Sequence, residues 1–229
     1  MGVRIGAVIA AAGRGTRLGR AGPKVLVPLG GVPILVRAVL PFQRSTAVHE
    51  IVVVASEEAL ADVRACLDRY HLSKVCAVVV GGAERQDSVA RGLAALGPCE
   101  VILVHDGARP LVEERLIEEV ARAASEFGAA IPALPLRETL KRVADGQVVE
   151  TVDRAGVWAA QTPQGFRADL LRTAHARART DGVIGTDDAV LVERLGHPVR
   201  VIPGRAQNLK VTTAEDLDIA EALVRWLES

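Results

Sequence analysis

The first residues with the types and spacing to do chemistry follow an apolar run near the N-terminus. They are Ala11-Ala12-Gly13-Arg14-Gly15-Thr16-Arg17-Leu18-Gly19, and Pro23-Lys24 follows shortly after. Small residues and glycines let the backbone approach a phosphate chain and direct N–H groups at it. Arg17 and Lys24 would flank that anion with a planar guanidinium and a compact ammonium. Two cations so close to the glycines favour phosphate binding over an ordinary glycine turn.

Neither of the two common glycine-rich phosphate motifs fits this segment. A Walker A loop needs Gly-Lys-Ser/Thr at a fixed spacing, and the chain lacks it here. In a dinucleotide fingerprint Gly13 and Gly15 would match, but Leu18 stands where the third glycine belongs. The phosphate group expected here is therefore bound in another way.

Two further polar groups follow predicted strands. Gly81-Gly82 lead into a helix that carries Asp87 and Ser88, and the structural interpretation is a plain loop in which one of these two side chains caps the helix. Asp106 comes directly after a buried strand, where a carboxylate is costly unless it serves a cation or a hydroxyl group. Pairing with Arg109 is the structural alternative for Asp106.

Lysine is rare among the 28 basic residues of this chain. The lysines are Lys24, Lys74, Lys141 and Lys210. An arginine-rich chain that keeps lysine at a few places suggests that a compact ammonium is needed there. We therefore interpret Lys210 as a functional cation; the structural alternative is a solvated surface lysine.

Composition excludes several classes of function. The 28 basic and 28 acidic residues balance, which argues against a large nucleic-acid footprint. No signal peptide opens the chain, and no apolar run reaches the ~20 residues of a membrane span. The odd cysteine count, without a C-x-x-C pair, favours a reducing compartment, so we expect the cytoplasm. The histidines show no metal-ligand spacing.

Strand-like apolar runs alternate with helix-period segments and predict βαβ units. Strands are expected at residues 5–10, 51–54, 75–80, 101–104, 130–134 and 199–202. Helices are expected at 34–42, 57–70, 85–96, 113–127, 168–179 and 186–195, and a last helix opens with the capping box Thr212-Thr213-Ala214-Glu215. The fold class is α/β: a Rossmann-like three-layer domain with a mainly parallel sheet. Ligands of such sheets gather beyond the carboxyl ends of the strands.

A polar hairpin interrupts this pattern. Residues 139–143 and 148–152 are β-rich and joined by Ala144-Asp145-Gly146-Gln147, and Asp-Gly is a strong hairpin signal. An isolated hairpin is marginally stable, so it should pack on the main domain or on a second subunit. We expect one domain, 1–229, with 136–157 as a projecting β-arm used in dimerisation.

The glycine loop with Pro23-Lys24 resembles the signature of sugar-nucleotide and polyol-phosphate nucleotidyltransferases. Further motifs narrow the resemblance because they stand in the expected order along the whole chain. They are Gly81-Gly82-Ala83-Glu84-Arg85-Gln86-Asp87-Ser88-Val89, His105-Asp106-Gly107-Ala108-Arg109-Pro110, Gln161-Thr162-Pro163-Gln164, Thr186-Asp187-Asp188 and Asn208-Leu209-Lys210-Val211-Thr212. Together they closely resemble the 2-C-methyl-D-erythritol 4-phosphate cytidylyltransferase family.

This resemblance implies a cytoplasmic, homodimeric transferase that moves CMP from CTP to methylerythritol phosphate and releases pyrophosphate in isoprenoid precursor synthesis. It makes Arg17 and Lys24 transition-state stabilisers, and Arg154 and Lys210 the residues that position the acceptor phosphate. Arg154 would reach the neighbouring subunit's site from the arm. The implied substrate-binding residues are Ala11, Ala12, Gly13, Gly15, Gly81, Gly82, Arg85, Ser88, Asp106, Arg109, Thr139 and Thr162. Mg²⁺ or another divalent cation would accompany CTP, held mostly by phosphate oxygens and water, with Asp106 as the candidate protein ligand.

Two alternatives remain open from the sequence. The acceptor could be ribitol 5-phosphate, because a sister family shares the nucleotide half of the site. A non-catalytic nucleotide-binding regulatory module is the alternative from another class, although a pure binder has no need of so many cations and carboxylates. A glycosyltransferase of similar fold is disfavoured, because Gly107-Ala108 follow Asp106 where paired aspartates would be needed.

Overall fold

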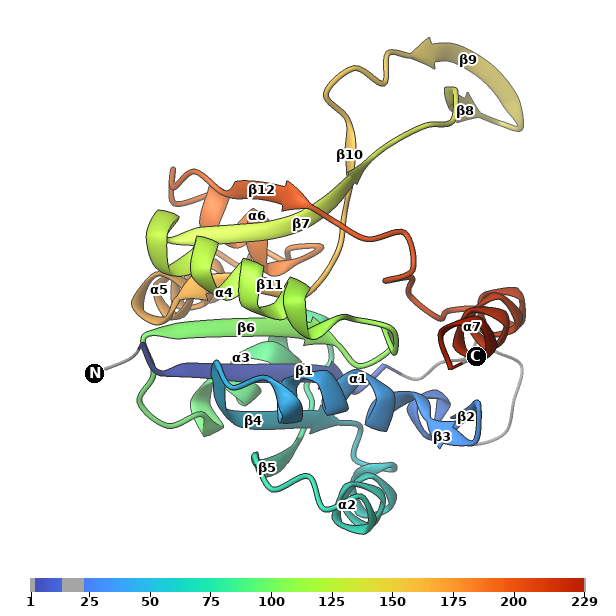
Figure 1. Cartoon of the computed structure of the whole chain (residues 1–229). Helices are drawn as coiled ribbons and strands as arrows, with labels where there is room; N and C mark the ends of the chain where they lie inside the picture. The colour runs from blue at the N-terminus through green and yellow to red at the C-terminus, as the bar shows by residue number, and fades with distance from the viewer. Residues whose placement is uncertain (1–2, 14–22, 229) are drawn as a thin grey trace.

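A mixed eight-stranded sheet forms the centre of the molecule (Figure 1). The computed structural model describes residues 3–13 and 23–228. The strand order is β10-β7-β11-β6-β1-β4-β5, and β12 pairs with β7. Neighbours β6, β1, β4 and β5 are mutually parallel, as are β12 and β7, whereas β11 and β10 are antiparallel to their partners. The expected mainly parallel α/β sheet is confirmed.

The elements have the following bounds. The strands are β1 (Ile5–Ala11), β2 (Pro28–Leu29), β3 (Val32–Pro33), β4 (Val48–Ala55), β5 (Val75–Val80), β6 (Val101–Asp106), β7 (Ala129–Pro135), β8 (Leu140–Ala144), β9 (Gln147–Val152), β10 (Trp158–Ala160), β11 (Gln164–Arg167) and β12 (Arg200–Pro203). The helices are η2 (Lys24–Leu26), α1 (Ile34–Arg44), α2 (Leu60–Arg69), α3 (Arg85–Ala95), α4 (Glu114–Phe127), α5 (Ala168–Thr180), α6 (Asp188–Glu193) and α7 (Ala214–Leu227).

Two helical layers cover the sheet because its central strands are apolar on both faces. In β1, Ala7 and Ile9 belong to the core cluster that contains α1, α2 and α4, whereas Val8 belongs to the cluster that contains α3, α5 and α6. Helix α3 packs especially closely: a Cβ on Gly92 would lie 2.5 Å from a methyl carbon of Val8. This packing brings the N-terminus of α3 to the carboxyl ends of the strands.

Two short strands of the central sheet, β10 and β11, were not predicted from the sequence, and neither was the small β2–β3 pair. Strand β11 inserts between β6 and β7 and pairs antiparallel with both. With only four residues it is too short to show a period, and α5 follows it without a loop. Its position nevertheless matters, because β11 carries Gln164 into the centre of the sheet beside β6.

The polar hairpin is present and projects from the body of the molecule (Figure 1). Strands β8 and β9 form a separate two-stranded sheet, and Asp145 and Gly146 both have positive φ, as a two-residue hairpin turn requires. Val148 and Val149 are about three-fifths exposed. The expectation that the hairpin packs on the main domain of its own chain is therefore wrong. Packing on a second subunit stays a prediction.

The capping box of the last helix lies one residue later than predicted. The N-cap of α7 is Thr213, whose side chain accepts from the backbone N–H of Asp216, while the Asp216 carboxylate accepts from Thr212 and Thr213. A threonine pair followed by two acidic residues, Glu215 and Asp216, fits either register, and the backbone turn selects the second. Within the described residues, no helix is long and apolar enough to cross a membrane.

Candidate active site

A cleft of about 740 Å³ opens at the carboxyl ends of the central parallel strands. Residues after β1, β4 and β5, the last residue of β6 and the segment before α7 line it. The predicted site residues in its lining are Ala11, Ala12, Gly13, Lys24, Gly81, Gly82, Arg85, Ser88, Asp106 and Lys210. These residues therefore meet beyond the carboxyl ends of the strands, where an α/β sheet is expected to bind its ligand.

The Gly81-Gly82 loop has no room for side chains. A Cβ on Gly81 would lie 2.4 Å from the Cβ of Ala12, and one on Gly82 would lie 2.2 Å from the Cβ of Asp87. The hydroxyl of Ser88 accepts a hydrogen bond from the N–H of Gly82 at 3.0 Å and donates to the carbonyl of Glu84. These contacts hold the loop against the end of β1 and form one wall of the cleft.

Different residues cap helix α3 and hold the loop that precedes it. Glu84 is the N-cap of α3, and Asp87 completes the capping box by accepting from the Glu84 N–H. Ser88 is buried and bonds the loop instead of capping the helix. One lone pair of its hydroxyl oxygen is left for a ligand.

Asp106 lies at the end of β6 among three cations. Lys210 Nζ is 2.9 Å from its Oδ2, Arg85 Nε is 3.3 Å from its Oδ1, and Arg109 Nε is 3.6 Å from Oδ2. Burial by itself would raise the pKa of the carboxyl, but Arg85 and Lys210 outweigh it and hold the pKa well below its usual range. Asp106 is therefore an ionised acceptor, able to take hydrogen bonds from hydroxyl groups.

Lys24 and Lys210 reach the same place from opposite ends of the chain. The ammonium of Lys24 donates to the carbonyl of Val211 at 2.8 Å, next to Lys210. Lys210 is ion-paired with Asp106 and 42% exposed in its side chain, so it is not merely a solvated surface lysine. The contacts place two ammonium groups at one end of the cleft.

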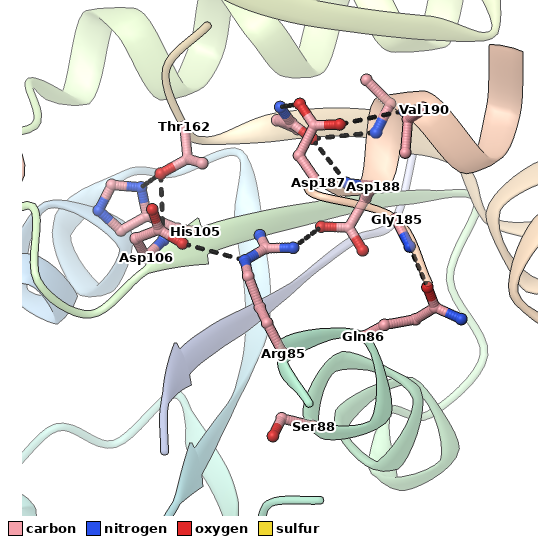
Figure 2. Close-up of polar contacts among 12 residues, drawn as sticks. Arg85, Gln86, Ser88, His105, Asp106, Thr162, Gly185, Asp187, Asp188 and Val190 are labelled. Carbon is pink, nitrogen blue, oxygen red and sulfur yellow. Dashed lines mark hydrogen bonds and ion pairs between the residues drawn. The ribbon is translucent and has the colours of Figure 1, made fainter. Parts of the chain in front are cut away.

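His105 and Thr162 form a buried pair behind Asp106 (Figure 2). The Thr162 Oγ accepts from the N–H of Asp106 at 3.0 Å and lies 3.0 Å from His105 Nδ1, and His105 Nε2 lies 3.1 Å from the carbonyl of Arg109. Burial lowers the pKa of His105 to about 4, so the ring is neutral at pH 7. A neutral ring accepts a hydrogen bond from the Thr162 hydroxyl at Nδ1 and donates one from Nε2 to the Arg109 carbonyl, so both ring nitrogens have a partner. Thr162 thus supports the backbone of Asp106.

Four other predicted site residues do not line the cleft. Thr162 is enclosed as described, and Arg109 is turned toward Asp106 and the carbonyl of Asn208, to which it donates at 2.7 Å. Thr139 and Arg154 are exposed at the base of the projecting arm. Gly15 and Arg17 lie outside the described residues.

The described residues do not form a protein cage for a divalent cation. Among them, no group of three His, Cys, Asp or Glu side chains could hold a metal ion. Both oxygens of Asp106, the candidate ligand, already contact cationic side chains. The donor set does not fit a resident metal, so we treat a divalent cation as part of the nucleotide substrate and derive no step through it.

Sequence reasoning missed a buried network behind Arg85 (Figure 2). Arg85 Nη1 donates to Asp188 Oδ2 at 2.8 Å, and the other Asp188 oxygen is 2.9 Å from His175 Nε2. The spacing of His175 in the sequence gives no sign of this contact. Asp188 belongs to a motif quoted for the resemblance, which was the one signal for it. Ser56, Glu57, Glu58, Arg91 and Thr212 also line the cleft and were not singled out.

Known proteins resemble this chain over nearly its whole length. The family model described as 2-C-methyl-D-erythritol 4-phosphate cytidylyltransferase matches residues 5–226. A protein of that name from Geobacillus thermodenitrificans is 46% identical over 219 residues, which are 95% of this chain and 96% of the relative. One from Bacillus licheniformis is 42% identical over 217 residues, covering 95% and 94%.

A solved structure agrees with these relatives. The crystal structure of 2-C-methyl-D-erythritol 4-phosphate cytidylyltransferase from Thermus thermophilus superposes with a TM-score of 0.82 at 38% identity. It covers 98% of this chain and 100% of that one. The likeness therefore extends to the fold as a whole, arm and closing helix included.

Proposed function

The chain belongs to the 2-C-methyl-D-erythritol 4-phosphate cytidylyltransferase family, and we propose that its cleft carries out that transfer. It transfers CMP from CTP to 2-C-methyl-D-erythritol 4-phosphate, which gives 4-diphosphocytidyl-2-C-methyl-D-erythritol and pyrophosphate for isoprenoid precursor synthesis. The observation that carries the assignment to this cleft is the meeting of Lys24, Lys210 and Asp106 beside the glycine-lined wall.

The reaction needs no protein nucleophile. An oxygen of the acceptor's phosphate attacks the α-phosphorus of CTP, and a new P–O bond forms. The bond from that phosphorus to the oxygen bridging it to the β-phosphate breaks, and pyrophosphate leaves with the electron pair. Because the attacking oxygen is already ionised, the protein contributes positioning and stabilisation of charge.

Lys24 supplies positive charge where negative charge builds on the α-phosphate, together with Arg17. Lys210 lies one residue from the carbonyl that Lys24 bonds, and we assign it to the acceptor phosphate. Asp106, ionised and aimed at the cleft, accepts hydrogen bonds from the acceptor's hydroxyl groups. Removing one such electrostatic donor from a transferase site costs roughly 10²–10³-fold in rate.

The glycine-lined wall suits the cytosine ring. Gly81 and Gly82 expose backbone groups to the cleft, and the tight contact between Gly81 and Ala12 limits its width. Backbone groups and the remaining lone pair of Ser88 can read the amine and carbonyl of a pyrimidine. A divalent cation, Mg²⁺ by preference, enters with the triphosphate.

The projecting arm completes the site of a second subunit. Thr139 and Arg154 are exposed near the base of the arm, outside the cleft of their own chain. In a homodimer joined through residues 136–157, Arg154 would hold the acceptor phosphate of the neighbour. We place the enzyme in the cytoplasm, as the sequence predicts.

Pyrophosphate release from CTP and Mg²⁺ tests the proposal, with methylerythritol phosphate and ribitol 5-phosphate offered separately. We expect turnover with methylerythritol phosphate and formation of the cytidine diphosphate adduct. Turnover with ribitol phosphate alone would keep the nucleotide site and overturn the acceptor.

The location of the site needs a matched pair of lysine variants. Lys24→Gln should abolish most pyrophosphate release, whereas Lys74→Gln should retain it. Lys74 donates to the carbonyl of Ser45 and is outside the cleft. Full activity of Lys24→Gln would overturn the assignment of the reaction to this cleft.

A further inference from the structure

Arg85 bridges two carboxylates that come from different parts of the fold (Figure 2). Its Nε is 3.3 Å from Asp106 at the end of β6, and its Nη1 is 2.8 Å from Asp188 at the start of α6. Arg85 is the first residue of α3, where a cation opposes the helix dipole. Its position is therefore set by the two carboxylates and not by the helix that carries it.

The Asp188 end of this bridge is fixed in the core. Asp188 is 1% exposed, and its second oxygen is bonded to His175 of α5, which is itself buried. Gln164 of β11 accepts from the backbone N–H groups of Asp188 and Ala189 at 3.2 and 3.1 Å. Both side chain and backbone of Asp188 are thus held by neighbours on other elements.

The Asp106 end lies at the cleft. Asp106 lines the cleft, and its carboxylate also forms ion pairs with Arg109, which is largely buried, and with Lys210, which is half-exposed. Burial would raise the pKa of Asp188, but Arg85 outweighs it and the pKa is lowered, so both carboxylates are ionised and share one guanidinium. An ionised Asp188 pulls Arg85 to one side, and Arg85 then offers its Nε edge to Asp106.

We propose that Asp188 is a positioning residue of the transferase site, which fixes Arg85 so that Arg85 holds the Asp106 carboxylate in the orientation that receives the acceptor. This rests on the proposed function only in taking Asp106 as a substrate-binding group. Asp188 touches no substrate itself. Without its charge, Arg85 keeps one carboxylate partner instead of two, and its guanidinium can turn about its side-chain bonds.

Isosteric variants test the relay. Asp188→Asn keeps the shape and the acceptor toward His175 but removes the charge. We expect kcat/KM for the acceptor to fall by about tenfold or more, because small displacements of positioning groups are costly. The matched control is Asp169→Asn: Asp169 is exposed in the first turn of α5, the helix that carries His175, and lies outside the cleft. It should act like the wild-type protein.

A double-variant cycle separates positioning from a purely structural role. If Asp188 acts through Asp106, adding Asp188→Asn to Asp106→Asn should change kcat/KM by less than about threefold, because the shared step is already lost. Losses that multiply would overturn the relay. Thermal unfolding of each variant shows whether stability follows activity. If Asp188→Asn does not fold, Arg85→Lys replaces it in the same cycle, with the same expectation.

The failure of the relay can be told from the failure of the proposed function. Wild-type kcat/KM in Asp106→Asn would remove Asp106 from the proposed site and the relay with it. An impaired Asp106→Asn beside an Asp188→Asn that matches Asp169→Asn would overturn the relay alone.

Discussion

The lysines of this arginine-rich chain bind oxygen atoms at defined places, and their surroundings divide them into two kinds. The ammonium of Lys24 donates to Val211 inside the cleft, whereas that of Lys74 donates at 2.6 Å to the carbonyl of Ser45 and is not among the residues that line the cleft. Burial lowers the pKa of Lys74. Lys74 thus serves the structure, and Lys24 lies where a phosphate chain would bind.

Replacing each of the two lysines by glutamine should show which of them serves the reaction. Lys24→Gln should lower kcat/KM by roughly 10²–10³-fold. Each variant loses a hydrogen bond to a backbone carbonyl, so their unfolding should change to a similar extent. Lys74→Gln should keep kcat/KM but lower the free energy of unfolding by about 1.5–3 kcal/mol, because a hydrogen bond from a charged group is lost. Steady-state pyrophosphate release and urea unfolding give both quantities. Equal loss of activity in both variants would contradict this division.

The neutral His105 predicts an acid-sensitive fold. An unfolded histidine takes up a proton below pH 6.5, whereas the buried ring does so only near pH 4. The unfolded state therefore binds more protons between these values, and stability falls as the pH drops through that window, by about 3 kcal/mol in all. Urea unfolding at several pH values should show a smaller decline in His105→Gln than in the wild-type protein.

The exposed His71 provides the control for this pH dependence. It has positive φ, which asparagine tolerates, so His71→Asn should fold. This variant should keep the full acid sensitivity of the wild-type protein. An identical decline in His105→Gln would mean that other groups cause it.

At this scale, the sequence predicts many residues of the cleft but not the network behind Arg85. Lys24 and Lys210 are conspicuous because lysine is rare, and Asp106 because it ends a buried strand. Asp188 and His175 have no such signal. Asp188 acquires its role through a contact with Arg85, about a hundred positions away, which only the fold brings near, and His175 acquires its role through Asp188.

At the scale of elements, the cleft depends on how closely α3 and its preceding loop approach β1. A Cβ on Gly81 would overlap Ala12 and Ser88, whereas one on Gly13 would meet no atom of the described residues within 4 Å. Gly81→Ala should therefore lower the free energy of unfolding by about 1–3 kcal/mol and weaken CTP binding. Gly13→Ala should fold with nearly wild-type stability. Urea unfolding and CTP titration measure both effects, and equal stability of the two variants would contradict the packing argument.

The start of α7 also shapes the cleft, because Thr212 lines it two residues after Lys210. The hydroxyl of Thr212 and the neighbouring backbone N–H groups bond the Asp216 carboxylate and lower its pKa to about 2. That contribution to stability is present above pH 4 and lost as the pH falls toward 2. Thr213→Ala should cost about 0.5–2 kcal/mol of unfolding free energy, as loss of an N-cap does. Asp218→Asn on the same helix is the control.

Elements with a strong period were predictable, and those set by pairing were not. The helix predicted at 85–96 nearly matches α3, which buries one regular face. The strand predicted at 75–80 matches β5, whose continuous apolar run marks it in the sequence. Strand β11 escaped because its four residues become a strand only through the gap between β6 and β7. The register of the α7 cap was ambiguous for a different reason: two neighbouring threonines could each serve as the N-cap.

At the scale of the molecule, the arm separates residues that one reaction would need together. Arg154 stands at the base of an exposed hairpin, while Lys24 lies in the cleft of the same chain. The exposed valines of β8 and β9 offer an apolar surface that one chain leaves uncovered. A homodimer with a twofold axis would bury that surface twice and exchange the two arms.

Mixing two inactive variants tests whether the arms are exchanged. Lys24→Gln and Arg154→Gln should each be nearly inactive as pure dimers. In a mixed dimer, the Arg154→Gln subunit keeps Lys24 and receives an intact arm from its partner, so one site is complete. With random pairing, half of the dimers are mixed and half of their sites are complete, so about a quarter of wild-type activity should return. No recovery, in samples shown by native mass spectrometry to contain mixed dimers, would mean that Arg154 does not act across the interface.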